Sequence, residues 1–232
     1  MPQSRRYPKY DSGRVAVTPW IAGLALCLSA CGTDPASETS KGEYDPVTGR
    51  LQSITYDRDG NGRIDTWTKM DGTRPVSSEI DTNEDGIIDR WEEYDEAGGL
   101  TRAGWIRTPF DSRAPDALAQ GRPDTWLYPS PDGKTSRIDH LDRDNEGREI
   151  ITRRELYEGE VLVRVEEDKD GDGVMDQWET WVNGVLRTVE FDEGADGRPD
   201  RRFTYENGQL VLIESEPSAS GTYTRRVVPG ER

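Results

Sequence analysis

ETWVNGVLRTVEFD, residues 179–192, decides how this chain folds. Its residues alternate in character on both sides of the dipeptide Asn183-Gly184. An alternation with a period of two is typical of a strand that has one buried and one solvated face. Asn-Gly tolerates the two positive φ angles of a type I′ turn, whose twist matches the flanking strands. The stretch therefore predicts a β-hairpin.

The same design recurs along the chain. Asn207-Gly208, Glu158-Gly159, Asp71-Gly72 and Asp132-Gly133 each lie between two alternating segments. A helical alternative fails because only about six residues separate each tryptophan at the end of an acidic segment from its turn, which is less than two helical turns. We therefore interpret each hairpin as part of one repeated unit.

An acidic segment precedes each hairpin, and one glycine in it sets the register of the repeat. The intervals between these glycines are 24, 35, 26, 26 and 24 residues, and the glycines are Gly62, Gly86, Gly121, Gly147, Gly173 and Gly197. The long interval indicates an insertion within residues 101–115. The predicted fold class is all-β, a repeat protein of about six loop-plus-hairpin units that form an elongated twisted antiparallel sheet. The pattern fits an open sheet as well as one that closes into a barrel.

Two acidic segments, residues 81–92 and 168–179, match the pattern D-x-[DN]-x-[DN]-G-x5-E at every fixed position. Calcium takes six to eight oxygen ligands, and carboxylates at alternate positions around a tight glycine turn supply them. The predicted ligands are Asp81, Asn83, Asp85, Asp89 and Glu92 in the first segment and Asp168, Asp170, Asp172, Asp176 and Glu179 in the second. Both segments are predicted to bind Ca²⁺.

The other acidic segments are less complete. One has Asp57, Asp59, Asn61 and Asp65 but Thr68 at position 12, and another has Asp192, Asp196 and Asp200 but Gly194 at position 3. The segments from Asp116 and Asp142 lack more ligands, and the first of these is expected to be metal-free. The alternative for all of them is a solvated Asp/Asn/Gly turn without metal. In the two complete segments, 81–92 and 168–179, the converging carboxylates repel one another unless a cation is present, which favours the metal there.

The acidic segments resemble the calcium loops of EF-hands, dockerins and thrombospondin type 3 repeats. The hairpins, such as residues 44–51, resemble the YD repeats of secreted bacterial proteins. The resemblance covers residues 44–214 and implies calcium binding on β-hairpins. No dockerin-like helix follows the loops and no thrombospondin cysteines are present, so no partner is carried over from those families.

Residues 1–30 have the pattern of a bacterial lipoprotein signal peptide. Basic residues are followed by the apolar run 15–28 and then by Leu28-Ser29-Ala30-Cys31, which resembles a lipobox. By that resemblance Cys31 is the lipidated first residue of the mature chain, with an incidental cysteine as the alternative. Gly32, in place of an aspartate, implies the outer membrane if the host is Gram-negative.

The remaining boundaries follow from composition. Residues 31–43 read as a flexible tether because they contain almost no apolar residue, and residues 44–214 form the repeat domain. Residues 215–232 are predicted to be a C-terminal tail, in which 222–228 can add one edge strand.

The formal net charge is −16, and it becomes −19 when residues 1–30, which carry a net +3, are removed. An acidic surface repels nucleic acid and attracts cations, so no nucleic-acid partner is expected. Only 32% of the residues are hydrophobic, which leaves little material for a core. A core-poor chain has reason to depend on bound metal for part of its stability.

The expected function is that of a cell-envelope lipoprotein, a calcium-binding structural or interaction module without catalysis. Its expected partners are the membrane, through the lipid, and an unidentified protein or polysaccharide. No catalytic motif is recognised, and His140, the single histidine, is expected at the surface.

Two alternatives to this function remain. A polysaccharide- or cell-wall-binding module predicts exposed tryptophans, and a carboxylate-dependent hydrolase predicts a cleft with two close carboxylates. The four tryptophans at position 11 of the acidic segments are interpreted as core or inter-repeat packing: Trp67, Trp91, Trp126 and Trp178.

Overall fold

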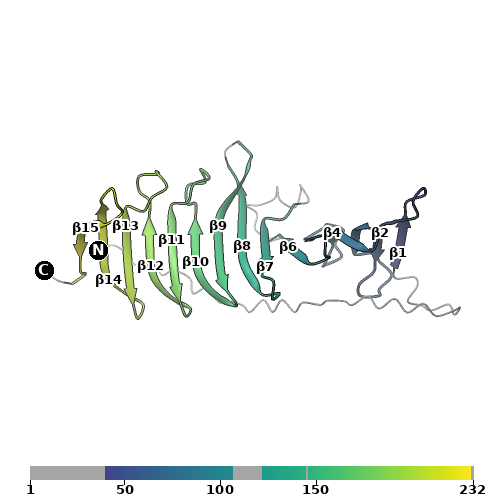
Figure 1. Cartoon of the computed structure of the whole chain (residues 1–232), viewed down its shortest axis with the longest axis horizontal. Coiled ribbons are helices and arrows are strands. Elements are labelled where there is room, and N and C mark those ends of the chain that lie inside the picture. Colours follow the sequence, from purple (N-terminus) through teal and green to yellow (C-terminus); the bar gives the residue numbers. More distant parts are fainter. Residues whose placement is uncertain (1–39, 107–121, 145, 231–232) are drawn as a thin grey trace. The chain divides into compact units, whose positions relative to one another are not determined.

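The computed structural model describes residues 40–106, 122–144 and 146–230. In these ranges the chain forms fifteen β-strands and no helix (Figure 1). Each strand pairs antiparallel with its neighbours in the sequence, so the order of strands in the sheet is their order in the chain. Because strands lie about 4.8 Å apart, the fifteen strands make an elongated sheet roughly 67 Å wide. The predicted all-β repeat fold is confirmed.

The strands are β1 (Ser40–Tyr44), β2 (Leu51–Tyr56), β3 (Thr66–Asp71), β4 (Arg74–Ile80), β5 (Arg90–Tyr94), β6 (Leu100–Trp105), β7 (Thr125–Pro129), β8 (Thr135–Arg143), β9 (Glu149–Glu158), β10 (Val161–Glu167), β11 (Gln177–Val182), β12 (Val185–Phe191), β13 (Arg201–Glu206), β14 (Gln209–Pro217) and β15 (Tyr223–Val227). In this described part, β1 and β15 have one partner strand each, so the sheet is open.

Connections of two kinds alternate along the sheet. Turns of two to six residues join each odd-numbered strand to the next at one edge, and the connections back to the following odd-numbered strand, most of them nine residues or longer, lie at the opposite edge. Four of the acidic segments lie at this second edge, named here the acidic edge: loops L1 (57–65), L2 (81–89), L3 (168–176) and L4 (192–200). The antiparallel order thus brings acidic segments from distant repeats to one edge.

The tight hairpins use the turn chemistry that the sequence predicts. Asn183 and Gly184 have φ angles of 52° and 74°, and both angles are positive, as a type I′ turn requires. Asn207-Gly208 repeats this geometry with 50° and 76°. At Gly159 the register differs, because Glu158 pairs with Val161 and the glycine becomes the first central residue, with φ 66°. A single positive φ at that place is the pattern of a type II′ turn.

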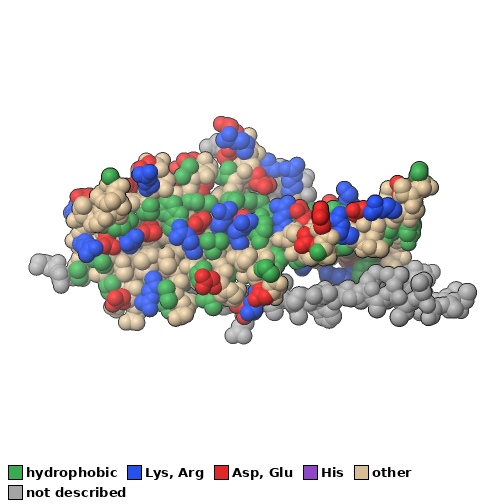
Figure 2. Space-filling model, in the orientation of Figure 1, with side chains coloured by type: hydrophobic (Ala, Val, Ile, Leu, Met, Phe, Trp, Pro, Cys, Tyr) green, Lys and Arg blue, Asp and Glu red, His purple; other side chains and the backbone are tan. Residues whose placement is uncertain are grey.

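The two faces of the sheet differ in character. Residues directly opposite each other on paired strands share a face, so the register defines rows that cross the sheet. One face, named here the tryptophan face, carries the row Trp67, Glu79, Trp91, Gly104, Trp126, Asp139, Arg154, Glu166, Trp178, Glu190, Arg202, Glu214 and Arg226. All four tryptophans at position 11 therefore lie in one row. In Figure 2, hydrophobic side chains form a band across the strands, beside Lys, Arg, Asp and Glu side chains.

The opposite face, named here the core face, holds most of the buried apolar side chains. Its central row includes Leu127, Val165 and Val189, and Val165 is fully buried. Val165 lies between Glu155 and Glu179, its partners on the two adjacent strands. Polar side chains thus interrupt the apolar row, which agrees with the low hydrophobic content of the chain.

The tryptophans at position 11 do not share one environment. Trp126 is 9% exposed, and its ring packs on Gly104, where an added Cβ would lie 2.9 Å from the ring atom Cε3. The Arg102 guanidinium lies 4.0 Å from the centre of the same ring. Trp67, in contrast, is 39% exposed. Packing is thus confirmed for Trp126, whereas Trp67 is open to solvent.

Both ends of the repeat domain extend further than the sequence analysis placed them. Ser40–Glu43 were expected in the tether, but they belong to β1 and pair with β2. The tether prediction rested on the lack of apolar side chains, whereas an edge strand needs only backbone hydrogen bonds. At the other end β14 continues to Pro217, and β15 is the predicted edge strand. The predicted signal peptide and Cys31 lie outside the described residues.

Candidate metal centre

Loops L1 to L4 share one backbone shape with two residues of positive φ. Position 4 has φ angles of 77°, 58°, 79° and 53° at Gly60, Glu84, Gly171 and Ala195. Position 6 has φ angles of 91°, 90°, 93° and 79° at Gly62, Gly86, Gly173 and Gly197. Glycine is the only residue that adopts a φ near 90° without strain, which explains the glycine that sets the register of the repeat.

The first aspartate of each loop points into the loop and is buried. Asp57, Asp81, Asp168 and Asp192 are 4%, 6%, 6% and 8% exposed. In each of them Oδ2 accepts a hydrogen bond from the backbone N–H of the position-6 glycine, at 2.7, 2.8, 2.8 and 2.6 Å. The position-6 glycine therefore also fixes the direction of the first carboxylate.

Two loops bring three carboxylates to one point. In L1 one oxygen each of Asp57, Asp59 and Asp65 lie within 4.8 Å of one another, and in L3 the same holds for Asp168, Asp170 and Asp176. These six residues were predicted as ligands, and the two groups could each hold a metal ion. The two groups are named here the L1 cluster and the L3 cluster.

Electrostatics in the L3 cluster favours a cation. Burial raises the pKa of Asp170, and the negative charges of Asp172, Asp176 and Asp168 raise it further against one backbone hydrogen bond. In the L1 cluster the balance differs at Asp57: burial raises its pKa, but hydrogen bonds from the N–H groups of L1 outweigh burial and lower it. L1 thus holds its first carboxylate ionised, ready for a cation.

In L2 the buried first carboxylate differs from those of L1 and L3 in its hydrogen bonds. Asp81 Oδ1 has no hydrogen-bond partner within the part of the chain that the structure describes. In L1 and L3 the corresponding oxygen accepts from the N–H of Gly60 and of Gly171, both at 2.7 Å. A buried anionic oxygen without a partner is costly, so a cation or proton donor belongs at this place. Asn83 and Asp85 form hydrogen bonds within the same loop.

L4 brings two of its predicted ligands together. A Cβ added at Gly194 would lie 3.3 Å from Asp200 Oδ2 and 3.7 Å from Asp192 Oδ1, so both carboxylates border the missing side chain. Asp196 Oδ1 instead accepts from the Arg198 N–H at 2.9 Å. L4 therefore supplies fewer converging carboxylates than L1 or L3.

Glu92 and Glu179, the predicted ligands at position 12, are not part of these clusters. They belong to β5 and β11, and a strand rises about 3.3 Å per residue, so position 12 lies roughly 10 Å beyond position 9. In an EF-hand a helix turns this residue back to the metal, which a strand cannot do. Glu92 instead accepts from Arg90 at 2.6 Å, and Glu179 accepts from Trp181 Nε1 at 3.0 Å.

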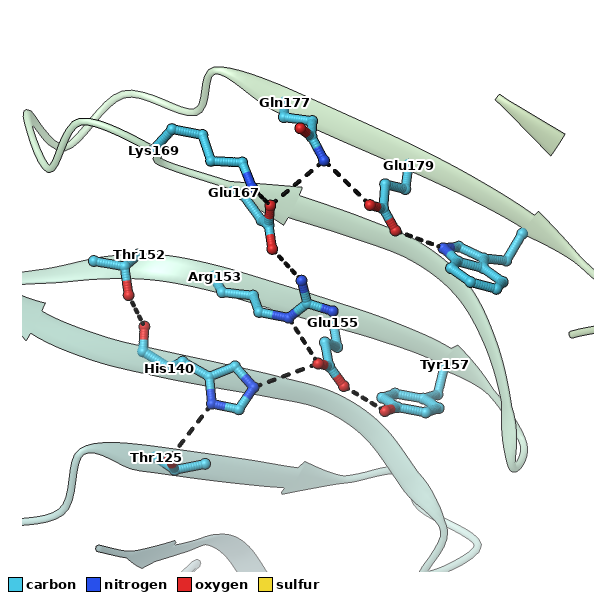
Figure 3. Close-up of polar contacts among 11 residues, drawn as sticks. Thr125, His140, Thr152, Arg153, Glu155, Tyr157, Glu167, Lys169, Gln177 and Glu179 are labelled. Carbon is cyan, nitrogen blue, oxygen red and sulfur yellow. Dashed lines mark hydrogen bonds and ion pairs between the residues drawn. The ribbon is translucent and has the colours of Figure 1, made fainter. Parts of the chain in front are cut away.

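These glutamates have a role on the core face that their place in the acidic segments does not predict. On the core face of β5, β9 and β11, a glutamate accepts hydrogen bonds from residues two before and two after it in the strand. The three groups are Arg90–Glu92–Tyr94, Arg153–Glu155–Tyr157 and Gln177–Glu179–Trp181. Figure 3 shows the groups around Glu155 and Glu179, with Glu167 of β10 between them. The signal was present as Arg/Gln-x-Glu-x-aromatic, a spacing that puts all three side chains on one face of a strand.

His140 is part of this network and not a surface residue. Its side chain is 13% exposed, and Nε2 lies 3.5 Å from Glu155 Oε1 (Figure 3). Burial raises the pKa of Glu155, but hydrogen bonds from His140, Tyr157 and Arg153 outweigh it and lower the pKa to about 2. The carboxylate therefore stays ionised between its donors.

Thr125, His140 and Glu155 stand in the order of a nucleophile, a base and an acid. Thr125 Oγ1 lies 3.5 Å from His140 Nδ1. Thr125 is fully buried, however, and its hydroxyl donates to Asp124 Oδ1 at 2.9 Å. A hydroxyl with no exposed surface cannot meet a substrate, so we assign this group to packing.

The two weakest acidic segments are placed only in part. In the segment from Asp142, Asp144 accepts from the Arg148 backbone N–H at 2.8 Å and closes the turn between β8 and β9. Most of the segment from Asp116 lies outside the described residues. In the described part, no helix has the length and apolar character that crossing a bilayer requires.

No protein-family model matches the chain, and no curated protein matches it. A porin-like protein from Bacteroides uniformis has 10% identity and a TM-score of 0.25 over 81% of this chain and 86% of that protein. A chain of the TcdB2–TccC3–Cdc42 complex has 12% identity and a TM-score of 0.19 over 82% of this chain and 15% of its own length. A protein of unknown function from Bacteroides fragilis has 10% identity and a TM-score of 0.11, covering 83% and 94%. At these scores the similarity assigns no function.

Proposed function

We propose that the chain is a calcium-binding structural or interaction module of the cell envelope, held to a membrane by a lipid on Cys31. The observation that carries the metal part is the convergence of three carboxylates in the L1 cluster and again in the L3 cluster. The lipobox-like residues 28–31 support the anchor, and Gly32 supports the outer membrane in a Gram-negative host. The proposal includes no catalytic step.

Calcium suits the acidic loops better than other cations. Their side-chain ligands are oxygens alone, which a hard cation prefers, and the loops contain no cysteine or histidine for zinc. Magnesium keeps several of its waters and is served by fewer carboxylates than converge here. The same arrangement of three carboxylates occurs in two separate repeats. This recurrence favours a cation site that belongs to the repeat over a coincidental cluster of acidic side chains.

Metal binding would offset the scarcity of apolar core. A site with an affinity of about 0.1 mM adds about 1.4 kcal/mol of stability in about 1 mM free calcium. Two such sites add about 3 kcal/mol, a sizeable share of the roughly 5–15 kcal/mol that holds an ordinary domain folded. Calcium would thereby stiffen the acidic edge and present the two faces of the sheet to a partner.

The test is calorimetric titration of the full chain in detergent with calcium and, separately, with magnesium. We expect at least two calcium sites and weaker heat with magnesium. The double variant Asp57→Asn, Asp168→Asn should lose those sites while its strand signal in circular dichroism is retained. Absence of calcium heat from the folded wild-type chain would refute the metal proposal. Separately, Cys31→Ser should move the protein from the membrane fraction to the soluble fraction.

A second candidate function rests on the exposed Trp67. This ring borders a hollow of about 520 Å³ on the sheet, lined in part by Ser53, Thr55, Ser77 and Glu79. An aromatic ring beside hydroxyl and carboxylate groups suits a sugar, whose C–H faces pack on the ring and whose hydroxyls form hydrogen bonds. Retention on immobilised cell-wall polysaccharide that Trp67→Ala abolishes would support this candidate, and retention unaffected by Trp67→Ala would refute it.

A further inference from the structure

L1 and L2 begin 24 residues apart in the sequence, at residues 57 and 81, but they are joined directly at the acidic edge. The Asp81 backbone N–H, at the start of L2, donates to the Asp65 carbonyl, at the end of L1, at 2.8 Å. A side-chain contact adds to this link, because Asn61 Nδ2 in L1 donates to the Glu84 carboxylate in L2. The same amide nitrogen donates to Asp59 Oδ2 at 3.1 Å. One amide thus lies between two carboxylates that belong to different loops.

Glu84 is unusual for its position. It stands at position 4, where φ is 58°, a conformation that disfavours residues other than glycine. L1 and L3 have glycine there and L4 has Ala195, so Glu84 is the one charged residue at this position among the four loops. A charged side chain placed where the backbone prefers glycine needs a compensating interaction. Its carboxylate reaches the ligands of L1.

L1 lacks an acidic ligand that Glu84 can supply. Position 12 cannot supply this ligand in any of the loops, because it lies in a strand, and in L1 it is Thr68 of β3. Calcium takes six to eight oxygens, more than the L1 cluster offers through Asp57, Asp59 and Asp65 alone. A carboxylate from the neighbouring loop would raise both the number of ligands and the negative charge around the ion.

L2 offers separate evidence for a cation site. Asp81 is 6% exposed, and its Oδ1 has no hydrogen-bond partner in the ranges that the structure describes. This observation is independent of the contacts of Glu84. It indicates that the first carboxylate of L2 is turned into a site that a ligand completes.

We propose that L1 and L2 bind their calcium ions as a coupled pair, with Glu84 of L2 serving as a ligand of the ion in L1. This inference rests on the proposed calcium function. An ion in L1 relieves the repulsion between Asp59 and Glu84 and holds Glu84 in its place. Glu84 lies three residues from Asp81, so the same event orders L2 for its own ion. Since coupling is reciprocal, an ion in L2 raises the affinity of L1 equally.

L3 and L4 are a matched control within the same chain. They are adjacent at the acidic edge and are joined by the same backbone bond, from Asp192 N–H to the Asp176 carbonyl at 2.8 Å. Ala195 occupies the place of Glu84, with φ 53°. This pair therefore has the backbone link without the carboxylate, and we expect its two loops to fill independently.

The experiment follows each loop separately during calcium titration of the full chain in detergent. The backbone amides of Gly62, Gly86, Gly173 and Gly197 bond to the first aspartates of L1 to L4, so their NMR shifts report filling loop by loop. In the wild type we expect the NMR shifts of Gly62 and Gly86 to change together, in one steep transition with the same midpoint calcium concentration. In Glu84→Gln we expect the Gly62 midpoint to rise about tenfold and to separate from that of Gly86.

A reciprocal variant tests the control pair. Ala195→Glu should lower the midpoint of Gly173 in L3 and should leave those of Gly62 and Gly86 unchanged. Unaltered Gly173 and Gly197 shifts in Glu84→Gln show that the variant is folded. If Glu84→Gln leaves the midpoint calcium concentration of Gly62 unchanged, the coupling is refuted, but the proposal that the loops bind calcium is not. If none of the four glycines in the wild type responds to calcium, the proposed function is overturned and the coupling with it.

Discussion

Gly173→Ala tests the conformation on which the acidic loops depend. Gly173 has a φ of 93°, and its N–H donates to the buried Asp168 at 2.8 Å. A Cβ added there would lie 3.8 Å from Ile150 Cγ2, an ordinary contact. The cost of the substitution therefore comes from the backbone and not from crowding.

A non-glycine residue in such a sparsely populated region costs about 1–3 kcal/mol. For a domain of this size, about 2 kcal/mol corresponds to a fall in melting temperature of about 4–8 °C. We expect this fall without calcium, and a larger difference with calcium because the L3 cluster is disturbed as well. Thermal melting in chelator and in calcium, followed by circular dichroism, measures both.

Ala195→Gly is the opposite change in L4. Ala195 has a φ of 53°, and glycine relieves the left-handed strain while adding entropy to the unfolded chain, so we expect a gain of up to about 1 kcal/mol. If Gly173→Ala melts at the wild-type temperature in chelator, the argument from φ is wrong. The argument is also wrong if Ala195→Gly and the wild type have the same melting temperature, because alanine at position 195 is then not strained.

Three further predictions concern the metal, the core face and the tryptophan face. Removal of calcium by chelator should lower the melting temperature by about 6–12 °C if two sites contribute about 3 kcal/mol together, and an unchanged melting curve would contradict this. Folding lowers the pKa of Glu155 from 4.5 to about 2, so its stabilisation is present above pH 4.5 and is lost as the pH falls toward 2. Urea unfolding between pH 5 and 2 should show a smaller acid loss in Glu155→Gln than in the wild type, and equal losses would contradict the assignment. Gly104→Ala should destabilise the sheet by about 1–3 kcal/mol, because its Cβ would lie 2.7 Å from Pro123 Cβ and 2.9 Å from Trp126 Cε3; wild-type stability in urea would show that the neighbours move freely.

Local signals carried the prediction of the fold. Asn183-Gly184 and Asn207-Gly208 adopt the positive φ pairs that their side chains and size favour, and the alternation around them produced strands. The loop glycines kept their register because φ near 90° excludes other residues. Each of these signals acts over a few neighbouring residues, so it can be read without knowledge of the rest of the chain.

Calcium binding by the EF-hand-like loops stays a prediction, and the predicted ligands at positions 1, 3 and 9 converge in L1 and L3. Asp57, Asp59 and Asp65 converge as predicted, and so do their counterparts in L3. Glu92 and Glu179 do not, because a strand replaces the helix that would return position 12 to the metal. The sequence pattern covers the loop and the first residues of the element that follows it. Whether that element is a helix or a strand depends on the rest of the fold.

By itself, the sequence determined the strands, the turns and the acidic loops, since each depends on backbone preferences over short distances. Only the tertiary structure decided that the sheet is open, that Trp67 is exposed while Trp126 is buried, and that His140 meets Glu155 across β8 and β9. It also decided that Glu84 reaches the neighbouring loop. These outcomes depend on which strands lie side by side and in which register, and a register of backbone hydrogen bonds between distant residues leaves no local mark in the chain.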